Sequence, residues 1–330
     1  MKKNVFVSWP GYSIDDPETG SRLVAAGHGV VLAPKFGARR EDELIALMGD
    51  ASACIVSTDP FTRRVIAANP HLRLIARVGV GTDSIDHDAA NEHGVGISIT
   101  PGMNAEPVAD QALAMILALI RRVVAQDENV KSGKWERVGR LTGWELPGKR
   151  VGVVGAGTIG RAVIRRLRGF DVDIVFFDPL VAAIDGAAKL PTLDRLLETS
   201  DIVTLHAPLL SATQRLIDGD AIARMKPGAF LINTSRGGLV DQKALFAALG
   251  SGRLGGAGLD VFEEEPPVAA DLADVPNLVC SAHMGGLSRE SLKRMTASAT
   301  SSVLAVLCGE VPDTIINPDA LRAARRAPAS

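Results

Sequence analysis

A glycine-rich segment in the middle of the chain has the residue types and spacing of a dinucleotide-binding turn. Residues 151–160 read VGVVGAGTIG, in which an apolar run ends at Gly155, Gly157 and Gly160 and a helical pattern follows. The first glycine permits a tight turn, the second lets the backbone approach a pyrophosphate, and the third allows close packing of helix on strand. The start of the helix adds unpaired N–H groups and a positive dipole end. The segment therefore predicts a bound dinucleotide.

An acidic residue follows this fingerprint at the distance suited to a ribose. Asp178 ends the next apolar strand pattern, residues 174–177, and comes 18 residues after Gly160. Its carboxylate can accept hydrogen bonds from the ribose 2′-hydroxyl of NAD, whereas the 2′-phosphate of NADP would face a like charge. Residues 179–188 contain no Arg or Lys to offset that charge. We therefore expect NAD as the cofactor.

Polar residues also follow strand patterns in the second half of the chain, where ligands of open parallel sheets bind. They are Arg236, Asp260, Glu265 and His283. Arg236 is a permanently charged planar group suited to bidentate binding of a carboxylate. His283 can exchange a proton near neutral pH, and a carboxylate such as Glu265 can orient the imidazole and stabilise its charged form. Hydride transfer at C2 of a 2-hydroxy acid needs these groups, so we expect Arg236, Glu265 and His283 to be catalytic.

Two series of short apolar runs, separated by helical patterns, must position these residues. One series occupies the first hundred residues and the other begins at Val151, and each has the rhythm of a parallel α/β sheet. Residues 104–132 predict one long connecting helix, and 287–307 predict a helix that returns to the first domain before a polar, frayed end, AARRAPAS. We expect a substrate domain to begin with 1–103, a nucleotide domain to span 104–286, and residues 287–330 to complete the substrate domain.

Seven segments in order give the chain a close resemblance to the D-isomer-specific 2-hydroxyacid dehydrogenases, a family that includes phosphoglycerate dehydrogenase and glyoxylate/hydroxypyruvate reductase. Besides the fingerprint they read ARVGVGTDSID at 76–86, TPGMNAEPVAD at 100–110, HAPLLSATQRLID at 206–218, NTSRGGLVD at 233–241, LDVFEEEP at 259–266 and SAHMGG at 281–286. The resemblance implies an α/β protein with two doubly wound parallel sheets, a Rossmann NAD-binding domain inserted into a flavodoxin-like substrate domain. It gives Arg236, Glu265 and His283 the roles that their chemistry suggests.

The resemblance also implies binding residues that their types alone do not single out. It places Thr158 and Ile159 at the pyrophosphate turn. Further cofactor contacts implied by the resemblance are Ala207, Pro208, Thr213, Thr234 and Asp260, the last two at the nicotinamide carboxamide. Backbone N–H groups of the loop Val78, Gly79 and Val80 would bind the substrate carboxylate, although a simple glycine turn explains that loop equally well.

Composition and charge argue against several classes of partner and location. The 330 residues are 46% hydrophobic with a net charge of -2, which gives no standing attraction to nucleic acid or to an anionic membrane surface. No spacing of His, Cys and acidic residues indicates a metal site. Three cysteines suit a reducing interior, and the N-terminal apolar run is too short for a signal peptide, so we expect a cytoplasmic protein. The resemblance implies a homodimer joined through the nucleotide domains, with the long helix at the interface.

The substrate and one alternative function stay open. Phosphoglycerate dehydrogenases commonly place basic residues after the third strand of the first domain, whereas residues 56–64 here read VSTDPFTRR, with Asp59 early. Phosphoglycerate, glycerate or hydroxypyruvate, and glyoxylate all remain candidates. The loop SWPGYS offers Trp9 or Tyr12 to the cleft between the domains. The same fold also serves NAD(H)-sensing corepressors, and oxidation of a small anion such as formate is a further alternative. Turnover with a panel of 2-oxo acids separates these functions.

Overall fold

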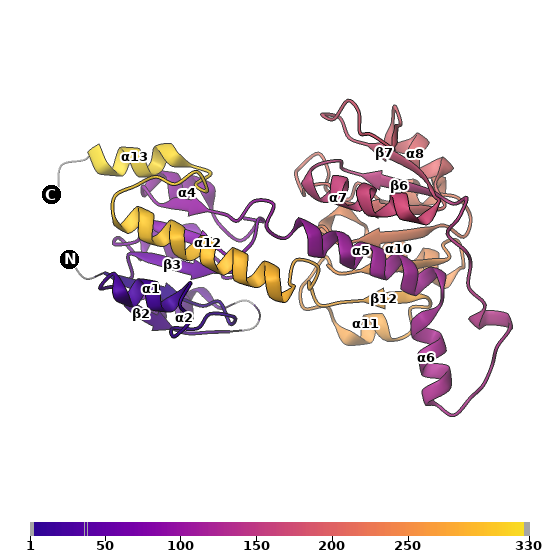
Figure 1. Cartoon of the computed structure of the whole chain (residues 1–330), viewed down its shortest axis with the longest axis horizontal. Coiled ribbons are helices and arrows are strands. Elements are labelled where there is room, and N and C mark those ends of the chain that lie inside the picture. Colours follow the sequence, from indigo (N-terminus) through magenta and orange to yellow (C-terminus); the bar gives the residue numbers. More distant parts are fainter. Residues whose placement is uncertain (1–2, 36, 38, 327–330) are drawn as a thin grey trace. The chain divides into compact units, whose positions relative to one another are not determined.

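The computed structural model describes residues 3–35, 37 and 39–326, and it divides into two compact units (Figure 1). Unit 1 consists of Met1–Asn104 and Ser288–Ser330, and unit 2 consists of Ala105–Leu287. Unit 2 is therefore one continuous stretch of chain, whereas unit 1 is made of two separate stretches.

Unit 1 is built on a five-stranded parallel sheet with the order β2-β1-β3-β4-β5. The strands are β1 Asn4–Val7, β2 Gly29–Leu32, β3 Ala53–Val56, β4 Leu74–Arg77 and β5 Gly96–Ser98. The helices between them are α1 Gly20–Ala25, α2 Glu41–Met48, α3 Arg63–Ala67 and α4 His87–Glu92. This is the doubly wound order of flavodoxin-like sheets, as expected, and it places the carboxyl ends of all five strands along one edge.

Two late helices complete unit 1. α12, Arg289–Leu307, packs on β3 and β4, and Figure 1 shows it beside the sheet. α13, Pro318–Arg326, corrects the prediction of a frayed end from residue 323, although residues 327–330 of that prediction lie outside the described residues. The helix is anchored by Leu321, which is 2% exposed and would clash with any Cβ on Gly96. Leu321 and Ala320 are both buried, so apolar contacts hold a helix whose composition is otherwise polar.

Unit 2 contains a seven-stranded parallel sheet with the order β12-β11-β10-β9-β6-β7-β8. The strands are β6 Arg150–Val154, β7 Asp173–Phe177, β8 Ala188–Lys189, β9 Ile202–Leu205, β10 Phe230–Asn233, β11 Gly256–Leu259 and β12 Leu278–Cys280. The helices are α5 Ala105–Ile120, α6 Val123–Lys131, α7 Thr158–Leu167, α8 Leu193–Thr199, α9 Gly219–Arg224, α10 Gln242–Gly250 and α11 Ala269–Ala273, with short 3-10 turns at Gly139–Leu141, Arg168–Phe170 and Gly237–Leu239. The order confirms the expected Rossmann sheet, whose direction of winding reverses between β6 and β9.

Apolar clusters cover both faces of this sheet. Val153 packs with Met115 and Ile164 on one face, whereas its neighbour Val154 packs with Leu205 and Leu231 on the other. Successive side chains of a strand point to opposite faces, so a continuous apolar run is what a doubly covered strand requires.

The prediction of one long helix over 104–132 is wrong, because the chain breaks between α5 and α6. Arg122 adopts a left-handed backbone with φ of 58°, and its guanidinium lies over the Trp144 ring, 5.0 Å from the centroid. The backbone N–H of Trp144 donates to the Ile120 carbonyl at 2.9 Å. A contact from a later segment therefore caps α5 where the sequence pattern alone would continue it.

Candidate active site

The three glycines of the fingerprint are constrained in different ways. Gly155 has φ of 88°, and a Cβ there would lie 2.6 Å from the carbonyl carbon of His206. A Cβ on Gly160 would lie 2.1 Å from the Gly155 carbonyl oxygen. Around Gly157, in contrast, no described atom lies within 4 Å of an added Cβ. The fold itself requires the first and third glycines, whereas the open space at the second has the place and character expected for a pyrophosphate.

The start of α7 and the end of β7 complete a dinucleotide site. Thr158 and Ile159 open α7, where backbone N–H groups have no partner within the helix. Asp178 accepts from the Ala156 N–H at 2.8 Å and from the N–H groups of Leu180 and Val181 at 2.8 and 3.1 Å. Burial raises the pKa of Asp178, but these backbone bonds outweigh it and hold the pKa below the ordinary value. The ionised carboxylate therefore braces the turn and keeps lone pairs for ribose hydroxyls.

Side chains after β9 and β10 border the same strand ends. The Thr213 hydroxyl donates to the Pro208 carbonyl at 2.7 Å, and the Ser235 hydroxyl donates to the Ala207 carbonyl at 2.6 Å. The Thr234 hydroxyl is buried and has no hydrogen-bond partner among the described residues. A buried polar group without a partner is rare in a folded chain, so this hydroxyl fits a cofactor contact. Together with the open space at Gly157, it makes the residues present fit NAD.

His206 lies beside this region but cannot act as an acid or base near neutral pH. It is buried, and its Nε2 lies 2.9 Å from the Thr204 hydroxyl. Burial lowers the pKa of His206 from 6.5 to about 3. The imidazole is therefore neutral in the folded protein, in keeping with a structural role.

The structure brings Glu265 and His283 together. Nδ1 of His283 lies 2.8 Å from Oε2 of Glu265, and the other carboxylate oxygen accepts from the Phe262 N–H at 3.2 Å. Burial raises the pKa of Glu265, but the hydrogen bond from His283 and the charges of His283 and Arg236 outweigh it, so the net pKa lies below the ordinary value. The ionised carboxylate fixes the orientation of the imidazole and leaves Nε2 to exchange a proton.

Arg236 is positioned by the turn that follows β10. The Asn233 side chain accepts from the Ser235 N–H at 3.0 Å and donates to the Arg236 carbonyl at 2.8 Å. This segment touches the loop after β11, because a Cβ on Gly237 would lie 1.8 Å from the Phe262 carbonyl oxygen. The electrostatic effect of Arg236 on Glu265 reflects this proximity. Arg236, Glu265 and His283 thus belong to one group of loops at the carboxyl ends of β10, β11 and β12.

Asp260 has a structural role that sequence reasoning missed. It is 1% exposed, and its two carboxylate oxygens accept from the Met284 and Gly285 N–H groups at 2.8 and 2.7 Å and from the Ser281 hydroxyl. The His283 N–H donates to the Asp260 carbonyl at 2.8 Å, and His283 itself has a left-handed backbone with φ of 53°. Asp260 therefore clamps the loop that carries His283. Its contact with the nicotinamide carboxamide stays a prediction.

In unit 1 the structure reduces the number of backbone N–H groups that could bind the substrate carboxylate. The Val78 N–H donates to the Val56 carbonyl at 2.8 Å, and the Gly79 N–H donates to the Thr100 hydroxyl at 3.1 Å. Both donors are used within unit 1, so the expectation that they are available to a substrate needs correction. Val80 is 40% exposed, and its N–H is the remaining candidate of the three. Tyr12 is buried rather than offered to solvent.

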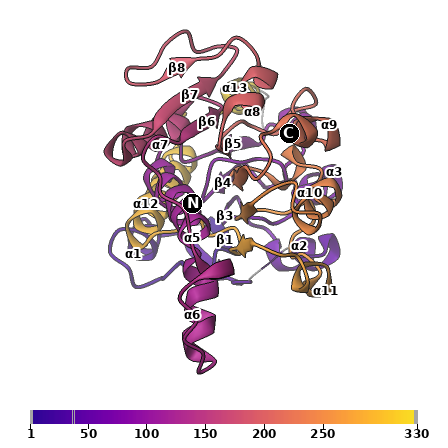
Figure 2. The same cartoon turned by 90° about the vertical axis from the view of Figure 1, so that its right-hand side faces the viewer.

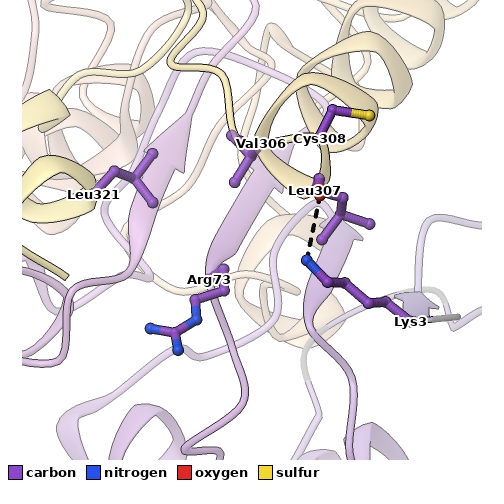
Figure 3. A pocket seen from close by; sticks show the side chains of 7 residues that line it. Lys3, Arg73, Val306, Leu307, Cys308 and Leu321 are labelled. Atoms are coloured by element: carbon purple, nitrogen blue, oxygen red, sulfur yellow. Dashed lines mark hydrogen bonds between the residues drawn. The ribbon is translucent and has the colours of Figure 1, made fainter. Parts of the chain in front are cut away.

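Unit 1 contains a cavity of about 300 Å³ (Figure 3). It is lined by Lys3 and Arg73, which precede β1 and β4, and by residues 306–309 and Leu321. Lys3 donates to the Leu307 carbonyl at 3.3 Å. Because the cavity faces the amino ends of the strands, it is distinct from the edge where parallel sheets bind their ligands.

In the described part of the chain, no helix is long and apolar enough to cross a membrane.

Comparisons with known proteins agree with this geometry. The family model described as the NAD binding domain of D-isomer specific 2-hydroxyacid dehydrogenase matches residues 113–285. The glyoxylate reductase of Korarchaeum cryptofilum is 38% identical over 331 residues, which cover 98% of each chain. The D-3-phosphoglycerate dehydrogenase of Mycobacterium tuberculosis is 37% identical over 94% of this chain, which spans 59% of that longer protein.

A solved structure from Thermus thermophilus matches with a TM-score of 0.88 and 35% identity, covering 95% of this chain and 99% of that one. Sequence and fold thus agree over nearly the whole length, and the matched family domain carries the fingerprint and the Arg236, Glu265 and His283 loops. The chain belongs to the D-isomer-specific 2-hydroxyacid dehydrogenase family and is an NAD-dependent oxidoreductase of 2-hydroxy acids.

Proposed function

We propose that the chain reduces a small 2-oxo acid to the (R)-2-hydroxy acid with NADH and also catalyses the reverse reaction. The observation that carries the proposal is the 2.8 Å contact between Glu265 and His283 in the loops beside Arg236. A guanidinium, a carboxylate and an imidazole at the ends of strands of a dinucleotide-binding sheet are the groups that 2-oxo acid reduction needs. The Korarchaeum cryptofilum relative, named a glyoxylate reductase, makes glyoxylate the first substrate to test.

Each side chain has a separate task in the proposed mechanism. NADH, when bound at the fingerprint turn, would supply the hydride for C2. Arg236 holds the substrate carboxylate through two parallel N–H bonds, which orients C2. His283 donates its Nε2 proton to the C2 oxygen as negative charge develops there, and Glu265 keeps the ring in place through Nδ1. In the oxidation direction His283 accepts the hydroxyl proton instead.

Preference for NAD over NADP forms part of the proposal. Asp178 carries its charge at the end of β7, where the adenosine ribose of a Rossmann cofactor binds. Backbone bonds hold its pKa below the ordinary value, so the charge is present at neutral pH. A 2′-phosphate would meet this charge, which disfavours NADP.

The decisive experiment follows NADH oxidation with glyoxylate, hydroxypyruvate, pyruvate and 3-phosphohydroxypyruvate. Turnover in the wild type that is lost in His283→Gln, with NADH affinity retained, would support the mechanism. His93→Gln is the matched control, because His93 is an exposed histidine in unit 1. Tight NADH binding without turnover of any 2-oxo acid would favour the corepressor-like function instead.

We also propose a cytoplasmic homodimer joined through unit 2. The apolar face of α5 is used within the chain against α7, β10 and β11, so we place the interface at α6 and the segment after it. Figure 1 and Figure 2 show α6 extending away from the rest of unit 2. Apolar side chains exposed there are Val123, Val124, Val130, Trp135 and Val138. An exposed apolar segment of this kind supports contact with a partner subunit. The three free cysteines support location in a reducing compartment.

A further inference from the structure

His283 has a backbone conformation that needs support from its surroundings. Its φ of 53° lies in the left-handed region, which residues other than glycine rarely adopt. Asp260 gives part of this support, because the N–H groups of residues 283–285 donate to its carbonyl and carboxylate oxygens. Consecutive N–H groups around a carboxylate hold a loop in one shape. The position of the imidazole therefore depends on what holds Asp260.

Asp260 is linked through Ser281 to a side chain of α5. The Ser281 hydroxyl donates to a carboxylate oxygen of Asp260, and the side-chain amide of Gln111 donates to that hydroxyl at 3.0 Å. A hydroxyl has one proton to donate, and its lone pairs can accept. Since the proton goes to Asp260, a lone pair is left for the Gln111 amide. The three side chains thus form hydrogen bonds that run in one direction, from Gln111 through Ser281 to Asp260.

The packing of α5 on the sheet of unit 2 places Gln111 beside this loop. Met115, four residues later on the same side of the helix, lies so close to β11 that a Cβ on Gly258 would be 2.9 Å from the Met115 Cβ. A Cβ on Gly285 would lie 2.7 Å from a carboxylate oxygen of Asp260 and 3.8 Å from the Cβ of Gln111. Glycine at position 285 therefore lets the loop approach Asp260 and α5 together.

We propose that Gln111 is a positioning residue that holds His283 in the orientation needed for proton transfer, through Ser281 and Asp260. The proposal rests on the proposed function, because it concerns the proton donor of the same reaction. Linked polar groups favour a single arrangement when each member has its partner. Loss of the Gln111 amide therefore lets the loop adopt other arrangements, in which the imidazole is displaced from the reacting oxygen.

Gln111→Met tests the first link, because methionine keeps the length and helix propensity of glutamine but cannot donate a hydrogen bond. We expect kcat with the preferred 2-oxo acid to fall by about 10-fold, because the proton donor is misplaced. KM for the 2-oxo acid should stay within about 3-fold, since Arg236 is unchanged. Gln111→Glu should lower kcat further, because its carboxylate competes with Asp260 for the Ser281 proton.

Two substitutions at Ser281 test the second link. Ser281→Ala removes the hydroxyl and should lower kcat at least as much as Gln111→Met does, whereas Ser281→Thr keeps the hydroxyl and should retain kcat within about 2-fold. In the Ser281→Ala background, Gln111→Met should have no further effect, because the amide has lost the group through which it acts. Additive losses in the double variant would overturn the proposal.

Asp110→Asn is the matched control, because it alters the neighbouring residue of α5, whose carboxylate pairs with Arg166 of α7. Its kcat should stay within about 2-fold of the wild type. Wild-type kcat in Gln111→Met would also overturn the proposal. If Gln111→Met does not fold, Gln111→Ala takes its place, since alanine adds no bulk and favours the helix.

Hydrogen exchange measured by mass spectrometry tests the link independently of activity. The N–H groups of residues 283–285 donate to Asp260, so their exchange reports how firmly the loop is held. We expect this exchange to be about 10-fold faster in Gln111→Met and unchanged in Asp110→Asn. If no 2-oxo acid is turned over, the proposed function fails, but faster exchange would still support the link from Gln111 to the loop. Unchanged exchange in Gln111→Met would overturn that link.

Discussion

A carboxylate that orients an imidazole contributes to catalysis only while it stays ionised and in contact. Glu265 meets both conditions, since it lies 2.8 Å from Nδ1 of His283 and its pKa is held below the ordinary value. We expect Glu265→Gln to lower kcat by about 100-fold or more, because the amide neither stabilises the imidazolium nor fixes its tautomer. Stopped-flow measurement of the hydride step checks this. Glu264→Gln, an exposed neighbour, should retain wild-type kcat.

Arg236 should be sensitive even to a change that keeps its charge. Lysine offers a single ammonium point charge, whereas arginine offers a planar pair of donors. We expect Arg236→Lys to lower kcat/KM by more than about 10-fold, equivalent to roughly 1.4 kcal/mol of transition-state stabilisation. Steady-state kinetics with the preferred 2-oxo acid measure the change, and wild-type values would argue against a carboxylate contact.

The buried histidine makes a prediction about stability rather than rate. The pKa of His206 is 6.5 when unfolded and about 3 when folded, so the unfolded chain binds more protons between these values. The folded state therefore loses stability as the pH falls through this window, and His206 alone should cost about 2 kcal/mol between pH 7 and pH 5. Urea unfolding at both pH values should show a loss in the wild type that exceeds the loss in His206→Gln by about 2 kcal/mol. Equal pH dependence in both proteins would refute the burial argument.

At the scale of elements, the fingerprint turn separates what the fold needs from what the cofactor needs. Gly157→Ala places a methyl group in open space, whereas Gly160→Ala drives one into the Gly155 carbonyl. We expect Gly157→Ala to keep the wild-type thermal midpoint while weakening NADH binding by about 10-fold or more. Gly160→Ala should lower the midpoint itself. Fluorescence titration with NADH and thermal unfolding of both variants measure the two effects, and unchanged NADH affinity in Gly157→Ala would exclude the pyrophosphate from that space.

The two parallel sheets could be predicted because each strand is a short apolar run that alternates with a helical pattern. Their doubly wound order was expected from the family resemblance rather than from these patterns. The strand patterns also placed Arg236, Glu265 and His283 after strand ends. Other features depend on contacts between segments far apart in sequence. The break at Arg122 depends on Trp144, and the order of α13 depends on Leu321 against Gly96. The clamp by Asp260 was missed because an acid at a strand end can face a ligand or its own loop, and only the fold decides which.

At the scale of the whole molecule, the exposed apolar segment after α5 predicts the assembly state. We expect the wild type to elute with twice the 34.6 kDa mass of one chain in light-scattering chromatography at micromolar concentration. Val130→Glu with Trp135→Glu should shift the mass to that of one chain, because the charged side chains cannot be buried unpaired at an interface. Val24→Glu, an exposed valine of unit 1, is the control and should not change the mass. A monomeric wild type would reject the proposal.

The sequence of unit 2 is inserted into that of unit 1, and this affects the order in which the two units are completed during synthesis. Residues 105–287 are synthesised as one continuous stretch, so the sheet of unit 2 has all its strands before α12 is synthesised. The strands of unit 1 are synthesised first, but β3 and β4 are covered only when α12 has also been synthesised. Until then their apolar side chains remain open to association with other chains. The unit whose synthesis begins first is therefore the unit that is completed last.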